Sequence, residues 1–228
     1  TDHFHVIQEL TRRVDRVRNR VQNRFRKPIN TLKPKKNNKT ITSEELIELE
    51  EASRSYYVLK KFNWLLASTN KKILDVNVER RFNHRLNRYL NYSEILAYML
   101  AIDDELEEAF YLRNDVTYFY DHCTYDTAKK QLEKIIIDFR SSTVAEMSPF
   151  ANTLTNWKKE IINSFIIVDD KANRKMNTAI VENRNKSIKL LKHASNGYLN
   201  WERFRNRILY TLNEDTTFYY TSIRKDGK

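Results

Sequence analysis

The chain has 228 residues, with 41 Lys and Arg against 30 Asp and Glu, so its net charge is +11. An excess this large favours a polyanionic partner, of which nucleic acid is the commonest, and a basic surface without a specific partner is the alternative. With only two glycines, the chain has neither a Gly-rich phosphate loop nor a Gly-x-Ser-x-Gly nucleophile elbow.

The single cysteine, Cys123, excludes an intrachain disulfide and a zinc ribbon, and it fits a reducing cytoplasm. No apolar run approaches the roughly 18 residues that span a membrane. There is also no signal-peptide pattern. With three prolines and many helix formers, the chain is expected to be mainly α.

The first expected helix covers residues 3–26, with an apolar stripe at Ile7, Leu10, Val14, Val17 and Val21. Most of its arginines lie off this stripe. Residues 27–41 contain two prolines and five lysines without any period, which indicates a basic linker or a mobile loop. The arginine-rich helix and residues 27–39 could track phosphates, or could form a solvated face.

Residues 42–45 form a capping-box pattern, which predicts a helix that ends near residue 68. Four more helices are expected at 76–90, 93–101, 104–121 and 126–140, with Ser93, Asp104 and Asp126 as N-caps for the last three. Pro149 suits the first position of another helix. Trp64, Trp157 and Trp201 are expected to anchor the core, and core packing is preferred over base stacking for the tyrosine and phenylalanine clusters.

Residues 165–168 are the strong strand candidate of the chain. A helix is expected over 173–194, with Gly197 as its stop, and a last helix over 200–212. The expected organisation is therefore a core helix at 1–26, the linker at 27–41, a helical insertion at 42–147, a C-terminal core segment at 148–212 and a tail at 213–228.

Two carboxylates near the ends of the chain are candidates for metal chemistry. Asp2 precedes the first helix, where it could equally act as an N-cap. Glu182 lies on the helix over 173–194, where it could equally be a solvated carboxylate paired with Lys186. Lys186 and Lys189 follow it on the same helical face. From spacing alone, this pair of carboxylates is not distinguished from the many other Asp and Glu pairs of the chain.

The motifs around these carboxylates resemble those of ISL-three-type insertion-sequence transposases with an Asp-Asp-Glu centre. The first is Asp2-His3-Phe4-His5-Val6, and the second is Val181-Glu182-Asn183-Arg184-Asn185 followed by Ile188-Lys189. A third joins Gly197-Tyr198-Leu199-Asn200-Trp201 to Phe204-Arg205-Asn206-Arg207-Ile208-Leu209. The resemblance covers nearly the whole chain, strongly at both ends and loosely between 30 and 145.

The resemblance implies a fold, a site and a reaction. The fold would be a partial ribonuclease-H-like α/β core with a large helical insertion and few strands. Asp2 and Glu182 would be the catalytic, metal-ligating residues for two Mg²⁺ or Mn²⁺ ions. Metal-activated water would cleave a phosphodiester at a transposon end, and the freed 3′-OH would attack target DNA. Contacts with double-stranded DNA are expected from Arg12, Arg13, Arg16, Lys186, Lys189 and Arg205.

Further expectations follow from the same resemblance. The family's first aspartate, zinc-binding module and helix-turn-helix are not found in the chain. The metal site is therefore expected to be incomplete, and the chain alone is expected to be catalytically inactive. Asn183 also replaces a usual glycine. A bacterial, nucleoid-associated location and a possible homodimer are implied. The alternatives are a catalytically inactive DNA-binding remnant and an unrelated basic helical protein that binds RNA. His3 and His5 could contact DNA or metal, or have a structural role.

Overall fold

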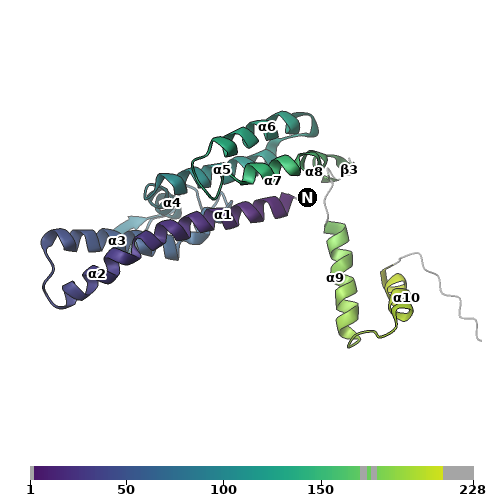
Figure 1. The fold of residues 1–228 in the computed structure, drawn as a ribbon, viewed down its shortest axis with the longest axis horizontal. Coiled ribbons are helices and arrows are strands. Elements are labelled where there is room, and N and C mark those ends of the chain that lie inside the picture. Colours follow the sequence, from purple (N-terminus) through teal and green to yellow (C-terminus); the bar gives the residue numbers. More distant parts are fainter. Residues whose placement is uncertain (1–2, 170–173, 176–178, 213–228) are drawn as a thin grey trace, which may run out of the picture. The chain divides into compact units, whose positions relative to one another are not determined.

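The structure is a computed structural model that describes residues 3–169, 174–175 and 179–212. It is mainly helical with few strands, which confirms the expected class (Figure 1). The chain divides into two compact units, residues 1–176 and 177–228. None of the described helices has the length and apolar character that a membrane span requires.

The first unit contains eight α-helices and a short 3₁₀ helix, η1, among its described residues. Their bounds are α1 His3–Arg24, α2 Arg26–Asn37, α3 Ser43–Lys61, η1 Asn63–Ala67, α4 Tyr92–Leu100, α5 Asp104–His122, α6 Tyr125–Ser141, α7 Phe150–Asn156 and α8 Lys158–Asn163. Two antiparallel hairpins complete it, β1 Arg81–Asn83 with β2 Arg88–Leu90, and β3 Ile167–Asp169 with β4 Arg174–Lys175. The strand expected at 165–168 therefore begins two residues later.

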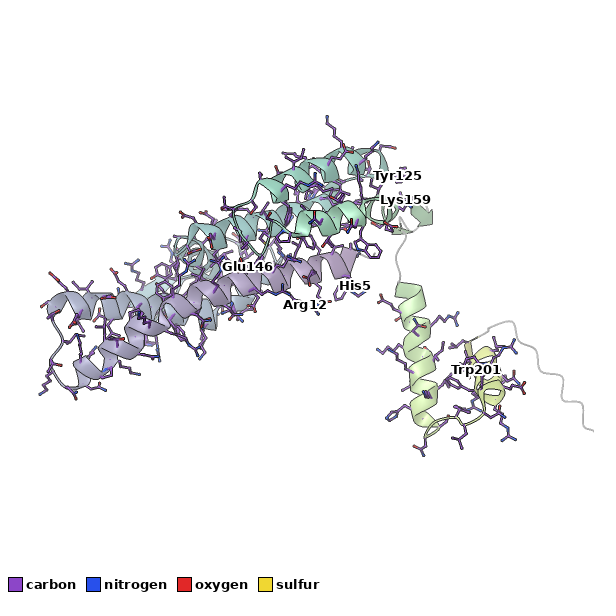
Figure 2. All side chains as sticks on the ribbon, viewed as in Figure 1. His5, Arg12, Tyr125, Glu146, Lys159 and Trp201 are labelled. Atoms are coloured by element: carbon purple, nitrogen blue, oxygen red, sulfur yellow. The ribbon has the colours of Figure 1, made fainter. Side chains whose placement is uncertain are left out.

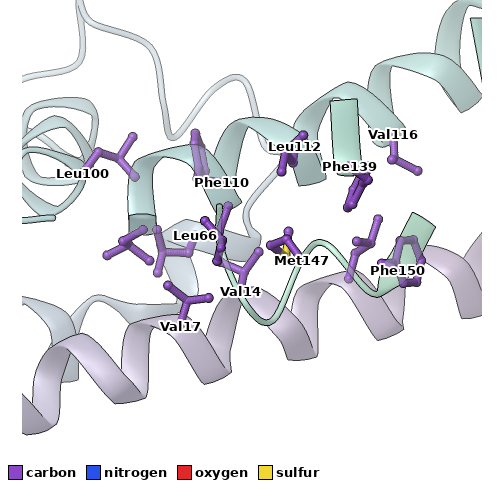
Figure 3. Packing of buried hydrophobic residues seen from close by; sticks show 14 of the residues in the cluster. Val14, Val17, Leu66, Leu100, Phe110, Leu112, Val116, Phe139, Met147 and Phe150 are labelled. Carbon is purple, nitrogen blue, oxygen red and sulfur yellow. The ribbon is translucent and has the colours of Figure 1, made fainter. Parts of the chain in front are cut away.

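The core of the first unit lies between packed helices. Helix α1 packs on α5 and on α3. Helix α6 packs on α5 and on α7. The buried stripe of α1 repeats at steps of three and four, which is the spacing of one helical face: Val6, Leu10, Val14, Val17 and Val21. Ile7 packs against this cluster but is only partly buried. Figure 3 shows Val14 and Val17 facing Leu66 and Phe110, and Met147 lies beside Val14 in the same cluster.

Residues 27–41 are largely helical, so the prediction of a linker or a loop was wrong. Helix α2 follows α1 almost directly, and α2 packs against α3. Pro28 is tolerated because it lies in the first turn, where a backbone N–H has no helical partner. Pro34 lies within the helix, where Leu32 is buried and Lys35 forms an ion pair with Glu45 of α3.

The helix predicted at 76–90 is absent, because this segment forms the β1–β2 hairpin. The Asn83 side chain makes the turn, since its Oδ1 accepts hydrogen bonds from the backbone N–H of Arg85 and of Leu86, each at 3.1 Å. Leu86 is buried and anchors the turn in the core, and Asn87 has a positive φ of 51°. Phe82 and Tyr89 face each other across the strands, with ring centroids 5.1 Å apart.

The capping box at Thr42 is confirmed, because its hydroxyl accepts from the Glu45 N–H and the Glu45 carboxylate accepts from the Thr42 N–H. The next three caps lie one or two residues earlier than predicted, at Asn91, Asp103 and Thr124 instead of Ser93, Asp104 and Asp126. These three residues have the extended backbone that an N-cap requires. Pro149 precedes α7 as its N-cap, so it is not the first helical residue.

The tryptophans do not anchor the core, so that prediction was wrong. Trp64, Trp157 and Trp201 are 41%, 46% and 67% exposed. The fully buried aromatic positions belong instead to Phe119, Phe139 and Phe150. A phenylalanine has no polar atom to satisfy in a dry core, whereas an indole N–H needs a partner.

The second unit contains α9 (Ala179–Ala194) and α10 (Trp201–Leu212), which contact each other. Gly197 follows α9 with a φ of 93°, and its N–H donates to the Lys192 carbonyl at 3.0 Å. The predicted stop at this glycine is therefore confirmed. The tail at 213–228 and Asp2 lie outside the described residues.

Candidate functional site

The two predicted metal ligands are placed differently. Asp2 lies outside the described residues, just ahead of the first residue of α1. Glu182 lies in the first turn of α9, where its side chain is exposed. Among the described residues, no group of three or more His, Cys, Asp or Glu side chains could hold a metal ion. The pairing of Asp2 with Glu182 therefore stays a prediction.

The surroundings of Glu182 on α9 are cationic. Lys186 and Lys189 lie one and two turns further along the helix, and both are exposed. Two cations beside an exposed carboxylate suit a phosphate-bearing partner, although an acidic residue in a first turn is also favourable for the helix itself. Arg184 has an internal role, since its guanidinium donates to the Leu212 carbonyl at the end of α10.

The motif at 197–209 builds the turn between α9 and α10. The Tyr198 ring stacks on Phe204, with centroids 4.9 Å apart, and its hydroxyl pairs with the Ser195 hydroxyl at 3.0 Å. The Asn200 side chain accepts from the Arg203 N–H at 3.1 Å and so caps α10. The motif is thus explained by a tight helical hairpin. Arg205 remains exposed on α10.

Three predicted DNA contacts on α1 share one carboxylate. The guanidinium groups of Arg12, Arg13 and Arg16 lie 3.9, 3.1 and 3.9 Å from Glu9. Arg13 also donates to the Glu146 carbonyl at 2.6 Å and covers the Phe150 ring, so it has a structural role. Arg12 and Arg16 have mostly exposed side chains, and Figure 2 shows Arg12 directed away from the helices packed on α1. Their contacts with DNA stay predictions.

The later arginines of α1 hold the fold together. Arg18 is buried and donates to the Leu59 carbonyl and to Asp15. Arg20 binds Glu146 through two hydrogen bonds of 2.8 and 2.9 Å, and Arg24 pairs with Asp103. Carboxylates of the same unit therefore neutralise much of the positive charge of this helix.

The histidines at the start of α1 are both exposed. The His3 ring lies 5.7 Å from the Tyr120 ring, and the His5 ring lies 5.6 Å from the Phe4 ring. These contacts support a structural role at the helix start.

A basic groove that the sequence did not single out as a site lies between α2, α3 and the β1–β2 turn. Its lining includes Lys33 and Lys36 of α2, Lys60 and Lys61 of α3, and Arg85 of the turn. The lysines of α2 were visible in the basic segment 27–39, but their meeting with α3 and the turn depends on tertiary structure.

Comparison with known proteins gives one match. The family model DDE_Tnp_ISL3, described as a transposase, matches residues 1–208. No curated protein and no solved structure matches the chain. The family match runs through the motifs of Asp2, Glu182 and Gly197 and across the helical segment between them. The chain therefore belongs to the ISL-three-type family of DDE transposases.

Proposed function

We propose that this chain acts in DNA transposition, by metal-dependent cleavage of a phosphodiester at a transposon end and strand transfer into target DNA. The observation that carries the proposal is the family match over residues 1–208. Membership in a transposase family indicates DNA as the substrate. The proposal includes a ribonuclease-H-like core to which residues 148–212 contribute, a nucleoid location, and a homodimer that would hold two transposon ends.

Asp2 and Glu182 are the proposed metal ligands. Carboxylate oxygens are the donors that Mg²⁺ and Mn²⁺ prefer, so the chemistry of these two side chains fits either ion. When bound, a pair of such ions activates the attacking oxygen and stabilises the leaving oxygen of the phosphodiester. The exposure of Glu182 supports the proposal, because a ligand that meets both metal and DNA must be reachable from solvent.

The cations near Glu182 have a binding role in this proposal. Lys186, Lys189 and Arg205 are exposed on α9 and α10, where they would contact phosphates of the DNA backbone. Such contacts position the scissile phosphate without reading sequence. Arg12 and Arg16 on α1 would add contacts of the same kind.

A matched pair of carboxylates tests the proposal. Glu182 and Glu202 are both exposed and both lie in the first turn of a helix of the second unit, so the helix dipole acts on each in the same way. The experiment compares Glu182→Gln with Glu202→Gln in nicking of duplex DNA that carries the element's ends, in Mg²⁺ or Mn²⁺. Where the chain is active only as part of a larger protein, both changes are made in that protein.

The expected result is a loss of nicking by about a hundredfold or more in Glu182→Gln, on the scale of removing a group that acts directly in the transition state. Glu202→Gln is expected to keep its activity. Asp2→Asn should reproduce the loss, and all three variants should still bind duplex DNA. Equal activity of the two glutamate variants would overturn the assignment of Glu182. Binding without any metal-dependent nicking by the unmodified protein would favour the inactive DNA-binding alternative.

A further inference from the structure

The groove between α2, α3 and the β1–β2 turn is a hollow of about 1130 Å³. Three separate stretches of the chain form its walls, Ile29–Lys36 on α2, Leu49–Lys61 on α3, and His84–Asn87 in the turn. The turn is held against α3 because Leu86 is buried in the core. The groove is therefore a built surface, fixed by tertiary packing.

The charge on the groove is strongly one-sided. The described side chains that line it include one carboxylate, Glu50, and six cations, which are Lys33, Lys36, Arg54, Lys60, Lys61 and Arg85. Glu50 is paired with Arg54 at 3.4 Å. The other five cations have no ion pair with a carboxylate of the described chain. Their charge is available to an external anion.

This arrangement contrasts with the arginine-rich helix α1. There Arg13, Arg20 and Arg24 each lie within 4.0 Å of a carboxylate of the same unit. A cation that already has an internal partner releases less free energy on binding phosphate than one that is hydrated and unpaired. The groove is thus a stronger candidate for phosphate binding than α1, although α1 carries more arginines.

The aromatic rings in the groove show what kind of contact it offers. Lys60 lies over the Tyr56 ring at 5.7 Å, and Arg85 lies over the Tyr57 ring at 5.3 Å. Both tyrosines are half-buried. Recognition of single strands depends on rings free to stack with bases. Because these rings are half-buried and have cations over them, the groove offers charge and few stacking platforms.

The ionisation of Tyr56 reflects the same positive field. Its burial raises the pKa, but the neighbouring Arg26 and Lys60 lower it further than burial raises it, so the net pKa is below the ordinary value. The downward direction of this shift is the one expected beside a cluster of cations.

We propose that this groove binds the sugar-phosphate backbone of double-stranded DNA, at a site formed by other residues than Asp2 and Glu182. The inference rests on the proposed function only in taking DNA as the partner, and it requires no cleavage chemistry. Duplex DNA is favoured because its phosphates are closely spaced, at about one per 1.7 Å of axis. A cluster of cations without carboxylate partners is complementary to such a high density of negative charge. Contacts of this kind are independent of base sequence.

The experiment measures binding of the full chain to a mixed-sequence duplex of about 20 base pairs, without metal, over a range of salt concentrations. The double variant Lys33→Ala/Lys61→Ala removes two cations from facing walls of the groove. The matched control is Lys129→Ala/Lys130→Ala, which removes the same charge from exposed positions on α6. Thermal unfolding of both variants checks that the fold is intact.

The expected result is a loss of affinity of about tenfold or more near 0.1 M salt in the groove variant, and a salt dependence shallower by about two in the slope of log K against log salt. The control should bind like the unmodified chain. Equal losses in both variants would show a general effect of net charge and overturn the site. The same binding measurement is made with a single strand of the same sequence. If the groove variant loses affinity for the single strand and keeps its affinity for the duplex, the assignment to duplex DNA is overturned. Because no cleavage is measured, failure of the catalytic proposal leaves this result unaffected.

Discussion

Arg20 and Glu146 are joined by two parallel hydrogen bonds, from Nε to Oε1 at 2.8 Å and from an Nη to Oε2 at 2.9 Å. They connect α1 to the segment before α7, across 126 residues of sequence. Glu146 is the more buried partner, with 18% of its side chain exposed against 35% for Arg20. The pair fixes the position of the chain that carries Met147 into the core.

Replacing Glu146 with alanine should lower the free energy of unfolding by about 1–2 kcal/mol, because a bidentate, partly buried ion pair is stronger than an exposed one. Urea unfolding at neutral pH measures the change. Glu48→Ala is the control, since Glu48 is exposed on α3 and should stay within about 0.5 kcal/mol. A similar loss in both variants would contradict a specific role for the pair.

The same carboxylate should contribute to the pH dependence of stability. The Arg20 guanidinium lowers the pKa of Glu146 below its ordinary value of 4.5, and burial opposes this shift only in part. A pKa lowered by folding gives a stabilisation that is complete above 4.5 and is lost as the pH falls through the folded-state value. Unfolding free energies between pH 7 and pH 3 should therefore fall less steeply in Glu146→Gln than in the unmodified chain. Parallel curves would refute the prediction.

Asn91 should be the critical cap of α4. It is buried, its Oδ1 accepts from the Glu94 N–H at 2.9 Å, and its Nδ2 donates to the carbonyls of Val76 and Val78. Asn91→Ala leaves all three partners without this side chain, so a loss of about 2–3 kcal/mol is expected. Ser93→Ala, at the position that the sequence suggested as the cap, should cost only a few tenths. Thermal unfolding of the two variants decides between the positions.

Gly197 should be required for the turn between α9 and α10. Its φ of 93° is strained for any residue with a Cβ, although nothing lies within 4 Å of the added atom. Gly197→Ala is therefore expected to destabilise the second unit by about 1–2 kcal/mol through backbone strain alone. Asn196→Gly, at a neighbouring φ of 52°, should instead be neutral or slightly stabilising. Hydrogen exchange of the α9 and α10 amides measures both, and a stable Gly197→Ala variant would contradict the strain.

The helices that the sequence predicted well are those with a clear apolar stripe or a capping box. α1 and α3 were found in this way, because burial of a periodic face and a local hydrogen-bond pattern both lie within a short stretch of sequence. Helix α2 was missed because its two prolines suggested a break. In the structure α2 packs against α3 and Leu32 is buried, and no local pattern contains this tertiary packing.

The β1–β2 hairpin was missed for a related reason. Its turn has no glycine and depends on hydrogen bonds to the Asn83 side chain and on burial of Leu86, which is set by distant residues. Predictions of the core also failed at the tryptophans, since size and hydrophobicity do not determine burial when a polar N–H must be satisfied.

The candidate site was also predictable from the sequence only where it depends on local motifs. Family motifs, which consist of neighbouring residues, could nominate Asp2 and Glu182 as candidate ligands, and that assignment stays a prediction. The motifs could not separate an arginine available to DNA from one paired inside the fold. Arg13 and Arg20 illustrate this, as both belong to a conspicuous arginine run and both bind Glu146. The groove cations come from three segments, so their meeting was not predictable from any one of them.

The crowding of cations in the groove also has an energetic consequence for the protein without DNA. Folding brings Lys33 and Lys36 of α2 to the same hollow as Lys60 and Lys61 of α3, and like charges held together repel one another. This repulsion lowers the stability of the DNA-free fold and is relieved by dissolved salt. The DNA-free chain should therefore unfold at a higher temperature as salt is raised from low concentration, in the same range where its affinity for DNA declines.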